Sequence, residues 1–302
     1  MKIRKLEKYI WLKICPILYK FSPEVASKIL FLFSKKQRLN LKEPKTFNEK
    51  IQWLKLYWQD PRVSKCADKY EVRKYAEEMG LVEILNPLYG VYDNVKNIDF
   101  ENLPNKFALK CSHGCGYNII CKCKDDLNID EVKEKVNKWM KSRYAHVAAE
   151  VQYDRIKPRI IVEEYIKGIN GHPPIDYKLF CFNGKVNFTM VCEGRGEAEY
   201  PQFNFYDNDW NVLHYYNNLN QINLNNRKHY LEKPESFKKM KEYAEKLSLQ
   251  FPFVRVDFYE INEKPILGEM TFTPTGGIDS FFDKNTDLLL GNLIKLPAKY
   301  IN

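Results

Sequence analysis

The stretch FVRVDFY (residues 253–259) is followed by LGEMT (residues 267–271) after a short turn-rich connection. In the first stretch Arg255 and Asp257 alternate with apolar residues. Side chains two positions apart on a strand point to the same face, so these two side chains project together. A hairpin would bring Glu269 opposite them. The sequence therefore predicts two carboxylates and a guanidinium on one face of a sheet.

Such a group is costly to bury unless something compensates its charge. A Mg²⁺ ion that carries nucleotide phosphates is a natural compensator, because hard oxygen ligands suit that ion. A structural ion pair on the wet face of a hairpin explains the same residues. The segment alone leaves both interpretations open.

Composition limits the class of protein. The 302 residues allow two domains or one large one, and 44% hydrophobic with 14% aromatic residues indicate a folded chain. The longest apolar stretch, residues 9–18, is broken by Lys13 and Pro16, so it suits neither a membrane span nor a signal peptide. We expect a cytoplasmic protein whose N-terminal helices pack on its body. They also suit contact with the inner face of a membrane or with a pathway enzyme.

The formal net charge is +9, from 48 basic and 39 acidic residues. The basic residues are spread along the chain, without an Arg-rich run or a nucleic-acid module. This pattern argues against nucleic acid as a partner and favours a small anionic ligand.

Five potential zinc ligands occur close together, namely Cys111, His113, Cys115, Cys121 and Cys123. Their spacing fits neither paired CxxC knuckles nor a Cys₂His₂ finger. Structural zinc is therefore the less favoured interpretation.

The remaining patterns predict helices and strands that segregate in blocks. The expected helices cover residues 5–19, 22–33, a segment that starts at Thr46, and residues 69–79, 130–149, 235–247 and 287–293. The expected strands cover residues 88–92, 106–110, 119–122, 159–166 and 177–192, the last with a hairpin turn at Asn183-Gly184. This arrangement indicates an α+β protein rather than a regular doubly wound sheet.

Lys110 ends an expected strand and is followed by the small-residue turn CSHGCG (residues 111–116). An ammonium group and several backbone N–H groups in such a turn can surround phosphate oxygens. The motif is not a Walker A loop, because the lysine precedes the glycines. An ordinary hairpin turn explains it as well.

Two further segments could contribute to a ligand site. The strand IIVEEYI (residues 160–166) is either an edge strand or a hinge whose backbone contacts an adenine. Asp176 and Lys178 share one face of the next strand.

The order of these motifs resembles the ATP-grasp superfamily, and within it the TupA-like (teichuronopeptide-biosynthesis-like) branch associated with bacterial cell-surface polysaccharides. The likeness covers about residues 45–295. The matching segments are TFNEKIQWLK (46–55), DKYEVR (68–73), Lys110 with its loop, EEYI (163–166), DYK (176–178), RVD (255–257) and GEMTFTP (268–274).

The resemblance implies an ATP-grasp fold, in which two α+β lobes clasp the nucleotide. A helical N-terminal region (1–60) would precede an N-terminal lobe (61–160) and a C-terminal lobe (161–302).

The resemblance also implies roles for individual residues. Lys69, Lys110 and Lys178 would contact the phosphates, with Asp176 beside them, and a loop with Ser112, His113, Gly114 and Gly116 would cover them. Glu163, Glu164, Tyr165 and Ile166 would form the adenine hinge, chiefly through the backbone of Glu164 and Ile166. Asp257, Glu269 and Thr271 would hold Mg²⁺, and Arg255 and Lys178 would act in catalysis. Thr271 departs from the family, which usually has Asn there, so a two-metal site is in doubt.

The implied activity is an ATP- and Mg²⁺-dependent carboxylate–amine ligase that acts through an acylphosphate. It would join an amino acid or another amine to a sugar acid or comparable anionic carboxylate. Two alternatives stay open: a glycosyltransferase of the same pathway and a non-catalytic nucleotide-binding scaffold. Asp207-Asn208-Asp209 matches a transferase motif, although a surface turn explains it more simply.

Overall fold

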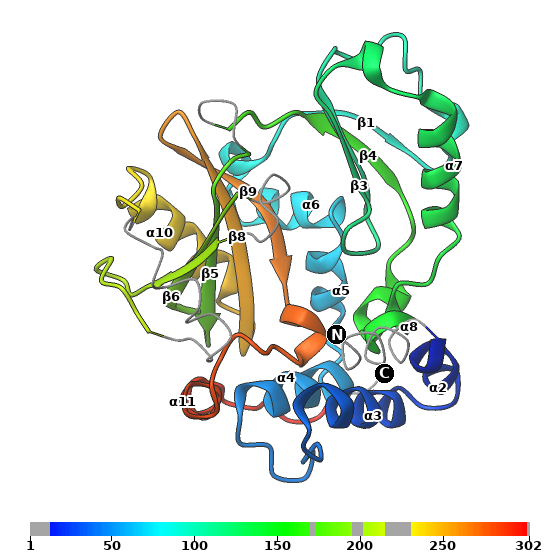
Figure 1. The fold of residues 1–302 in the computed structure, drawn as a ribbon. Helices are drawn as coiled ribbons and strands as arrows, with labels where there is room; N and C mark the ends of the chain where they lie inside the picture. Colours follow the sequence, from blue (N-terminus) through cyan, green and yellow to red (C-terminus); the bar gives the residue numbers. More distant parts are fainter. Residues whose placement is uncertain (1–12, 169–172, 195–201, 215–230, 301–302) are drawn as a thin grey trace.

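The computed structural model describes residues 13–168, 173–194, 202–214 and 231–300, and it has the expected α+β architecture with two antiparallel sheets (Figure 1). The four-stranded sheet has the order β1 (Leu88–Tyr92), β4 (Ile160–Glu164), β2 (Phe107–Cys111), β3 (Asn118–Cys121). The five-stranded sheet has the order β7 (Gln202–Tyr206), β6 (Lys185–Glu193), β5 (Asp176–Phe182), β8 (Phe253–Ile261), β9 (Lys264–Thr271).

The other described elements are helices and 3₁₀ turns. In chain order they are α2 (Cys15–Phe21), α3 (Pro23–Lys35), α4 (Phe47–Tyr57), α5 (Pro61–Ala67), α6 (Glu71–Glu78), η2 (Val82–Ile84), η3 (Val95–Asn97), η4 (Lys124–Asp126), α7 (Ile129–Met140), α8 (Ala145–Ala148), η5 (Val151–Arg155), α10 (Phe237–Ser248), η7 (Pro274–Gly277) and α11 (Lys284–Leu293).

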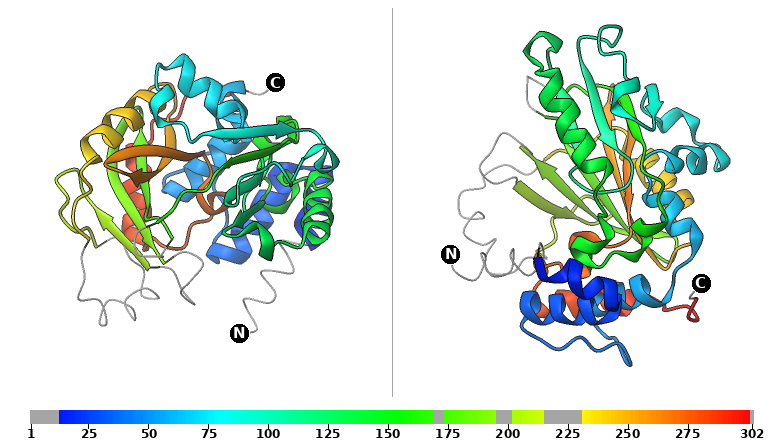
Figure 2. Two further views of the ribbon diagram at one scale, coloured as in Figure 1. Left: turned by 90° about the horizontal axis from the view of Figure 1, so that it is seen from above. Right: turned by 90° about the vertical axis from the view of Figure 1, so that its right-hand side faces the viewer.

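One face of the four-stranded sheet is covered by α7, which lies along the outer side of the sheet (Figures 1 and 2). Phe107 and Val162 point at this helix and pack with Val136. Because side chains alternate along a strand, Lys110 and Glu163 lie on the opposite face.

The five-stranded sheet has one apolar face and one face that is divided into an aromatic part and a polar part. On the apolar face, residues such as Leu179 pack against α5, α6 and α10. On the divided face, Phe180 and Phe253 pack against α4 and α11, which lie together at the bottom of Figure 1. Farther along the same face Lys178 pairs with Asp257. The polar part of this face is the setting of the candidate site.

Most of the expected elements are confirmed. The five strand predictions match β1 to β6, and Asn183 and Gly184 form the expected hairpin turn, both with positive φ. Thr46 and Glu49 form a capping box at the start of α4. Ser22 caps α3, whose first residue is proline.

The expected helix over residues 130–149 is wrong in length. Helix α7 ends at Met140, and both the N–H and the hydroxyl of Ser142 donate to the carbonyl of Trp139. A serine that bonds the nearby backbone in this way ends a helix. The short helix α8 follows, and Ala149 after it has a left-handed φ of 52°. Of the helix expected over residues 5–19, the first eight positions lie outside the described residues.

The expected segment boundaries do not coincide with the sheets. The boundary between residues 160 and 161 falls inside β4, which pairs with β1 and β2. Helices α5 and α6 belong to the expected N-terminal lobe but pack on the five-stranded sheet. The division into 1–60, 61–160 and 161–302 therefore stays a prediction.

Helix α4 anchors the chain that follows β9. Asn48, Gln52 and Lys55 occupy one side of the helix. The Gln52 side-chain amide donates to the carbonyls of Gly276 (3.0 Å) and Gly277 (2.9 Å). The Asn48 side-chain amide donates to the carbonyl of Asp279 (3.1 Å) and to the carboxylate of Asp287 (2.9 Å). Its side-chain oxygen accepts from the N–H of Asp279 (2.5 Å). The N-terminal helical region is thus bonded to the end of the strand that carries the site.

We expect Asn48→Ala to lower the free energy of unfolding by about 2–4 kcal/mol, because it leaves buried partners without hydrogen bonds. Urea denaturation measures this loss. Asn102→Ala is the matched control, since Asn102 is exposed and bonds Asp99; it should cost less than about 0.5 kcal/mol. Equal losses in the two variants would show that α4 does not anchor this segment.

Candidate nucleotide and metal site

Strands β8 and β9 form the predicted hairpin, and its register decides which side chains share a face. The turn is made by residues 262–263, both with positive φ, and it pairs Ile261 with Lys264. An unbroken ladder from this turn would place Gly268 opposite Asp257. Glu269 would then point to the apolar face of the sheet.

A bulge at Gly268 corrects this register. The ladder shifts by one residue, so that Asp257 pairs with Glu269 and Arg255 pairs with Thr271. A Cβ atom on Gly268 would approach the carbonyl oxygen of Asp257 to 3.2 Å, which makes glycine suitable at this position. The bulge therefore brings four polar side chains to one face.

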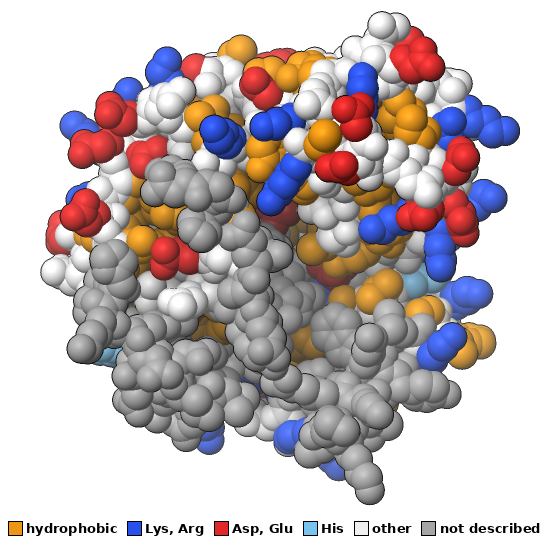
Figure 3. Space-filling model, turned by 45° about the horizontal axis from the view of Figure 1, so that its top comes forward, with side chains coloured by type: hydrophobic (Ala, Val, Ile, Leu, Met, Phe, Trp, Pro, Cys, Tyr) orange, Lys and Arg blue, Asp and Glu red, His pale blue; other side chains and the backbone are white. Residues whose placement is uncertain are grey.

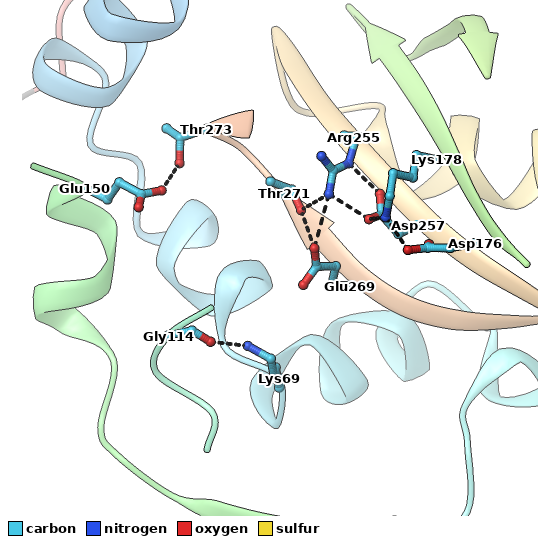
Figure 4. Close-up of polar contacts among 10 residues, drawn as sticks. All are labelled: Lys69, Gly114, Glu150, Asp176, Lys178, Arg255, Asp257, Glu269, Thr271 and Thr273. Atoms are coloured by element: carbon cyan, nitrogen blue, oxygen red, sulfur yellow. Dashed lines mark hydrogen bonds and ion pairs between the residues drawn. The ribbon is translucent and has the colours of Figure 1, made fainter. Parts of the chain in front are cut away.

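These side chains form a continuous network of ion pairs (Figure 4). Arg255 donates from Nε to Asp257 Oδ1 and from Nη2 to Asp257 Oδ2, both at 2.7 Å. Lys178 Nζ donates to Asp257 Oδ2 at 2.6 Å and to Asp176 Oδ2 at 2.5 Å. Arg255 Nη2 also lies 3.2 Å from Glu269 Oε1. Lys178 and Asp257 are buried and the Arg255 side chain is 12% exposed, so the network depends on mutual neutralisation.

Burial and ion pairing act in opposite directions on the pKa values of this network. Burial raises the pKa of Asp257, while Arg255 and Lys178 oppose that change. Burial lowers the pKa of Lys178, but Asp257 and Asp176 raise it above its usual value. Each charge therefore stabilises the others in place.

Glu269 is the accessible member of the network, with 34% of its side chain exposed. Its Oε1 accepts from the Thr271 hydroxyl at 3.0 Å, and within the described part of the chain its Oε2 has no hydrogen-bond partner. Burial would raise the pKa of Glu269, but Arg255, Lys69 and Lys178 lower it to about 2. This carboxylate is ionised and has one oxygen available for a ligand.

Lys69 approaches Glu269 from the segment between α5 and α6. Its N–H donates to the carbonyl of Ser112 at 3.3 Å, and its Nζ donates to the carbonyl of Gly114 at 2.5 Å (Figure 4). Asp68 is buried and accepts the N–H of Tyr70 at 2.8 Å, which shapes the start of α6. The DKY segment therefore ties the loop after β2 to the site.

That loop is held at one end and open at the other. The Ser112 hydroxyl accepts the N–H of Arg159 at 3.2 Å, and His113 Nε2 donates to the carbonyl of Trp139 at 3.0 Å. Ser112 and His113 are buried, and burial lowers the pKa of His113. Gly116 has a φ of +74°, and no atom lies within 4 Å of the position of a Cβ. Gly114 is buried as well, with Tyr117 against the position of a Cβ, so Gly116 is the exposed glycine that is placed to approach a ligand.

Lys110 pairs with Glu163 at 2.6 Å on the four-stranded sheet, on the face turned away from α7. Arg73 Nη1 contacts the other oxygen of Glu163 at 3.3 Å. Two cations surround one carboxylate, so this face carries excess positive charge.

The expected hinge is already bonded on one side. The Glu164 N–H donates to the carbonyl of Pro87 at 2.9 Å, and the Glu164 carbonyl accepts from the Asn86 side chain at 2.8 Å. Tyr165 and Ile166 are half-buried, and the Ile166 N–H has no acceptor in the described ranges. The free N–H of Ile166 and the second lone pair of the Glu164 carbonyl remain for a ligand.

The structure thus brings the predicted residues together in two groups. Direct contacts join Asp176, Lys178, Arg255, Asp257, Glu269 and Thr271, with Lys69 and Gly114 beside them. Lys110, Glu163, Glu164, Tyr165 and Ile166 lie on or next to the other sheet. Figure 3 shows a hollow with Lys and Arg side chains along its upper edge and acidic side chains deeper inside.

A family model of TupA-like ATP-grasp proteins matches residues 49–295 of this chain. The chain belongs to the TupA-like ATP-grasp family. This membership confirms the expected ATP-grasp fold. No curated protein sequence matches this TupA-like chain.

Several solved structures are similar to this chain at low identity. The D-alanine–D-alanine ligase of Bacillus anthracis, complexed with ATP, is 15% identical with a TM-score of 0.46, and the match covers 75% of this chain and 61% of that enzyme. The ligase of Helicobacter pylori is 17% identical with a TM-score of 0.43, with 82% and 69% covered. D-cycloserine synthetase DcsG is 14% identical with a TM-score of 0.42, with 78% and 72% covered. The TupA-like chain thus spans about 61% of the first of these enzymes.

The cysteine-rich segment shows no zinc centre. Cys111 and Cys121 are buried, Cys115 is exposed, and His113 bonds a backbone carbonyl. Among the described residues, no three His, Cys, Asp or Glu side chains are placed to hold a metal. A Mg²⁺ ion at the two site carboxylates would therefore need further ligands from its substrate.

The Asp207-Asn208-Asp209 segment is a turn, as expected. Asp207 Oδ1 accepts the N–H groups of Asp209 (2.9 Å) and Asn211 (2.8 Å). This carboxylate is used to form the turn, so the segment gives no support to a glycosyltransferase site.

Sequence reasoning missed two buried residues beside the site, Glu150 and Thr273, which are bonded to each other (Figure 4). Thr273 continues the alternation of Glu269 and Thr271 along one face and could have been found that way. Glu150 follows two alanines and has no local pattern that marks it.

His113 should make stability depend on pH. Its folded pKa is lowered, so below about pH 6.5 the unfolded chain binds a proton that the folded chain does not, and stability falls as pH falls. In His113→Gln this contribution, at most about 1.4 kcal/mol per pH unit, should be absent. Urea denaturation at about pH 7.5 and about pH 5.5 measures it. An unchanged pH dependence in the variant would contradict the buried, neutral state of His113.

Proposed function

We propose that this protein is an ATP- and Mg²⁺-dependent, ADP-forming carboxylate–amine ligase. The observation that carries the proposal is the pairing of Asp257 with Glu269 across β8 and β9, with Arg255 and Lys178 in direct contact. Two carboxylates suit a hard divalent cation, and two fixed cations suit a transferring phosphoryl group.

The residues present fit a Mg²⁺ ion. Asp257 and Glu269 supply oxygen ligands, and Glu269 Oε2 is open among the contacts of the described residues. A divalent cation at Asp257 would compete with Arg255 and Lys178, and these side chains could then bond phosphate oxygens. When bound, Mg²⁺ neutralises charge on the phosphates. The Thr271 hydroxyl donates to Glu269, so we assign it chiefly to orienting this ligand.

The other predicted residues receive roles that match their positions. Lys69 and Lys110 would bind phosphate oxygens, with Gly116 as the approachable part of the covering loop and Gly114 holding Lys69 through its carbonyl. The Glu164 carbonyl and the Ile166 N–H would bind the adenine edge. Ser112, His113 and Glu163 hold these parts in place.

In the proposed reaction, an oxygen of the substrate carboxylate bonds to the γ-phosphorus as the bond to ADP breaks. The neutral amine nitrogen then bonds to the carbonyl carbon and gives up one proton to water, and the bond to phosphate breaks. No protein nucleophile is required. Arg255 and Lys178 stabilise the charge on the transferring phosphoryl group because they are fixed in a buried network.

We further propose that the substrates are a sugar acid and an amino acid or another amine, joined during the synthesis of a bacterial surface polysaccharide. Support comes from the TupA-like family match and from the net charge of +9, which favours an anionic substrate.

Mg·ATP should raise the melting temperature by about 5 °C or more at a hundredfold excess over its dissociation constant. Asp257→Asn and Glu269→Gln should lose most of this rise, because each removes a ligand charge. Differential scanning fluorimetry measures the shift. Glu263→Gln, in the exposed turn of the same hairpin, should keep it.

Turnover completes this test. ADP should be released when a uronic acid and an amino acid are both present, and not with either one alone. Stabilisation by a UDP-sugar in place of ATP would contradict the ligase. Mg·ATP binding with no turnover across such a panel would favour a nucleotide-binding scaffold.

We also propose that the N-terminal helices bind an anionic membrane surface. Ile17, Phe21 and Val25 are 60%, 85% and 46% exposed on α2 and α3, and Lys13 and Lys20 are exposed beside them. Exposed apolar side chains next to lysines complement anionic lipid. No described helix is long and apolar enough to span a bilayer.

Vesicles with about a third phosphatidylglycerol should co-sediment with the protein, and pure phosphatidylcholine vesicles should bind far less. Phe21→Glu should weaken binding about tenfold or more, because it removes an apolar contact and adds repulsion. Val82→Glu replaces a residue that is 61% exposed away from these helices, and it should have no effect. Equal binding by both variants would contradict the proposal.

A further inference from the structure

A second buried polar group lies next to the proposed phosphoryl-transfer site. It consists of Lys55 on α4, Glu150 and Gln152 after α8, and Thr273 after β9. Their exposed fractions are 5%, 4%, 7% and 5%. The proposed roles of the site residues do not use this group.

Glu150 is held through one of its two oxygens. The Thr273 hydroxyl donates to Glu150 Oε1 at 2.5 Å and accepts from the Gln152 side-chain amide at 2.8 Å (Figure 4). The Ser64 hydroxyl in turn donates to the carbonyl of Gln152 at 2.8 Å. Glu150 Oε2 has no hydrogen-bond donor among the residues that the structure describes. The carboxylate is therefore fixed in orientation, with one oxygen open.

Lys55 does not neutralise Glu150 by direct contact. Its ammonium donates to the carbonyls of Ala148 (3.1 Å) and Gly276 (3.2 Å), and within the described ranges it forms no ion pair with Glu150. Burial raises the pKa of Glu150 and lowers that of Lys55, while the two charges oppose these shifts. A buried carboxylate with one neutral hydrogen bond is costly, and a cationic ligand would offset the cost.

This group lies next to the site. Thr273 lies two residues after Thr271, the last residue of β9, and Figure 4 shows Glu150 beyond Thr273 on the side away from Glu269. The negative charge of Glu269 adds to the effect of burial and raises the pKa of Glu150. Burial raises the pKa of the half-buried Tyr153, and the charges of Glu150 and Glu269 raise it further. A molecule beside Tyr153 would thus be within electrostatic reach of both carboxylates.

We propose that Glu150 binds the ammonium group of the amine substrate. This inference rests on the proposed ligase function and extends it to the recognition of a primary amine. Thr273 and Gln152 orient the carboxylate, and Lys55 holds the surrounding backbone. The amine would then lie on the side of Glu269 that faces away from Asp257. The alternative is a purely structural role, in which Glu150 only connects the segment after α8 to the segment after β9. The experiment must distinguish this role from amine binding.

Isothermal titration calorimetry with Mg²⁺ and the ATP analogue AMP-PNP tests the proposal. Ammonium, ethanolamine, glycine, L-alanine and L-lysine are titrated into the protein loaded with the analogue. At least one should bind the wild type, and its dissociation constant should rise about tenfold or more in Glu150→Gln, because a charge-assisted bond is lost. Asp154→Asn, four residues along the same segment and bonded to Tyr19, should bind the amine as the wild type does.

The outcomes separate the two proposals. If AMP-PNP binds all three proteins but no amine binds the wild type, or the amine binds Glu150→Gln equally well, the inference is wrong and the ATP site stands. If AMP-PNP does not bind the wild type, the ligase proposal fails, and the inference with it. Should Glu150→Gln not fold, Glu150→Asp retains the charge at a shorter reach. This variant should bind the amine more weakly and AMP-PNP as tightly as the wild type does. Unchanged amine binding would contradict the proposal.

Discussion

The rest of the site depends on the one-residue register shift at Gly268. This bulge turns Glu269 onto the face that carries Asp257 and Arg255. Without it, the carboxylate would point into the apolar core between β9 and α10, where a charge is not tolerated. The ion-pair network, and with it the proposed Mg²⁺ and phosphoryl chemistry, follows from this local break in the ladder.

The same sheet face explains why the N-terminal helical region belongs to the site. Half of the face is aromatic and is covered by α4 and α11, and the other half is polar and carries the ion-pair network. Asn48, Gln52 and Lys55 of α4 bond the segment after β9. Helix α4 therefore fixes the position of Thr273 and, through it, of Glu150.

Sequence patterns predicted what depends on local alternation and turn chemistry. The charged row on β8, the strand around Lys110 and the hairpin at Asn183-Gly184 were found in this way. The end of α7 was missed, because a side-chain bond from Ser142 ends a helix whose apolar spacing continues. The contact between Glu150 and the end of β9 was missed because it joins segments more than a hundred residues apart. Long-range packing, not local preference, places that carboxylate.

The most direct test is a crystal structure with Mn²⁺ and ADP, in which the anomalous signal locates the metal. The account predicts a peak bonded to Glu269 and Asp257, with the phosphates between Lys69 and the β8–β9 face and the adenine beside Ile166. It also predicts that Arg255 and Lys178 contact phosphate oxygens instead of holding Asp257 alone. A metal bound elsewhere, or a nucleotide outside the hollow between the two sheets, would contradict it.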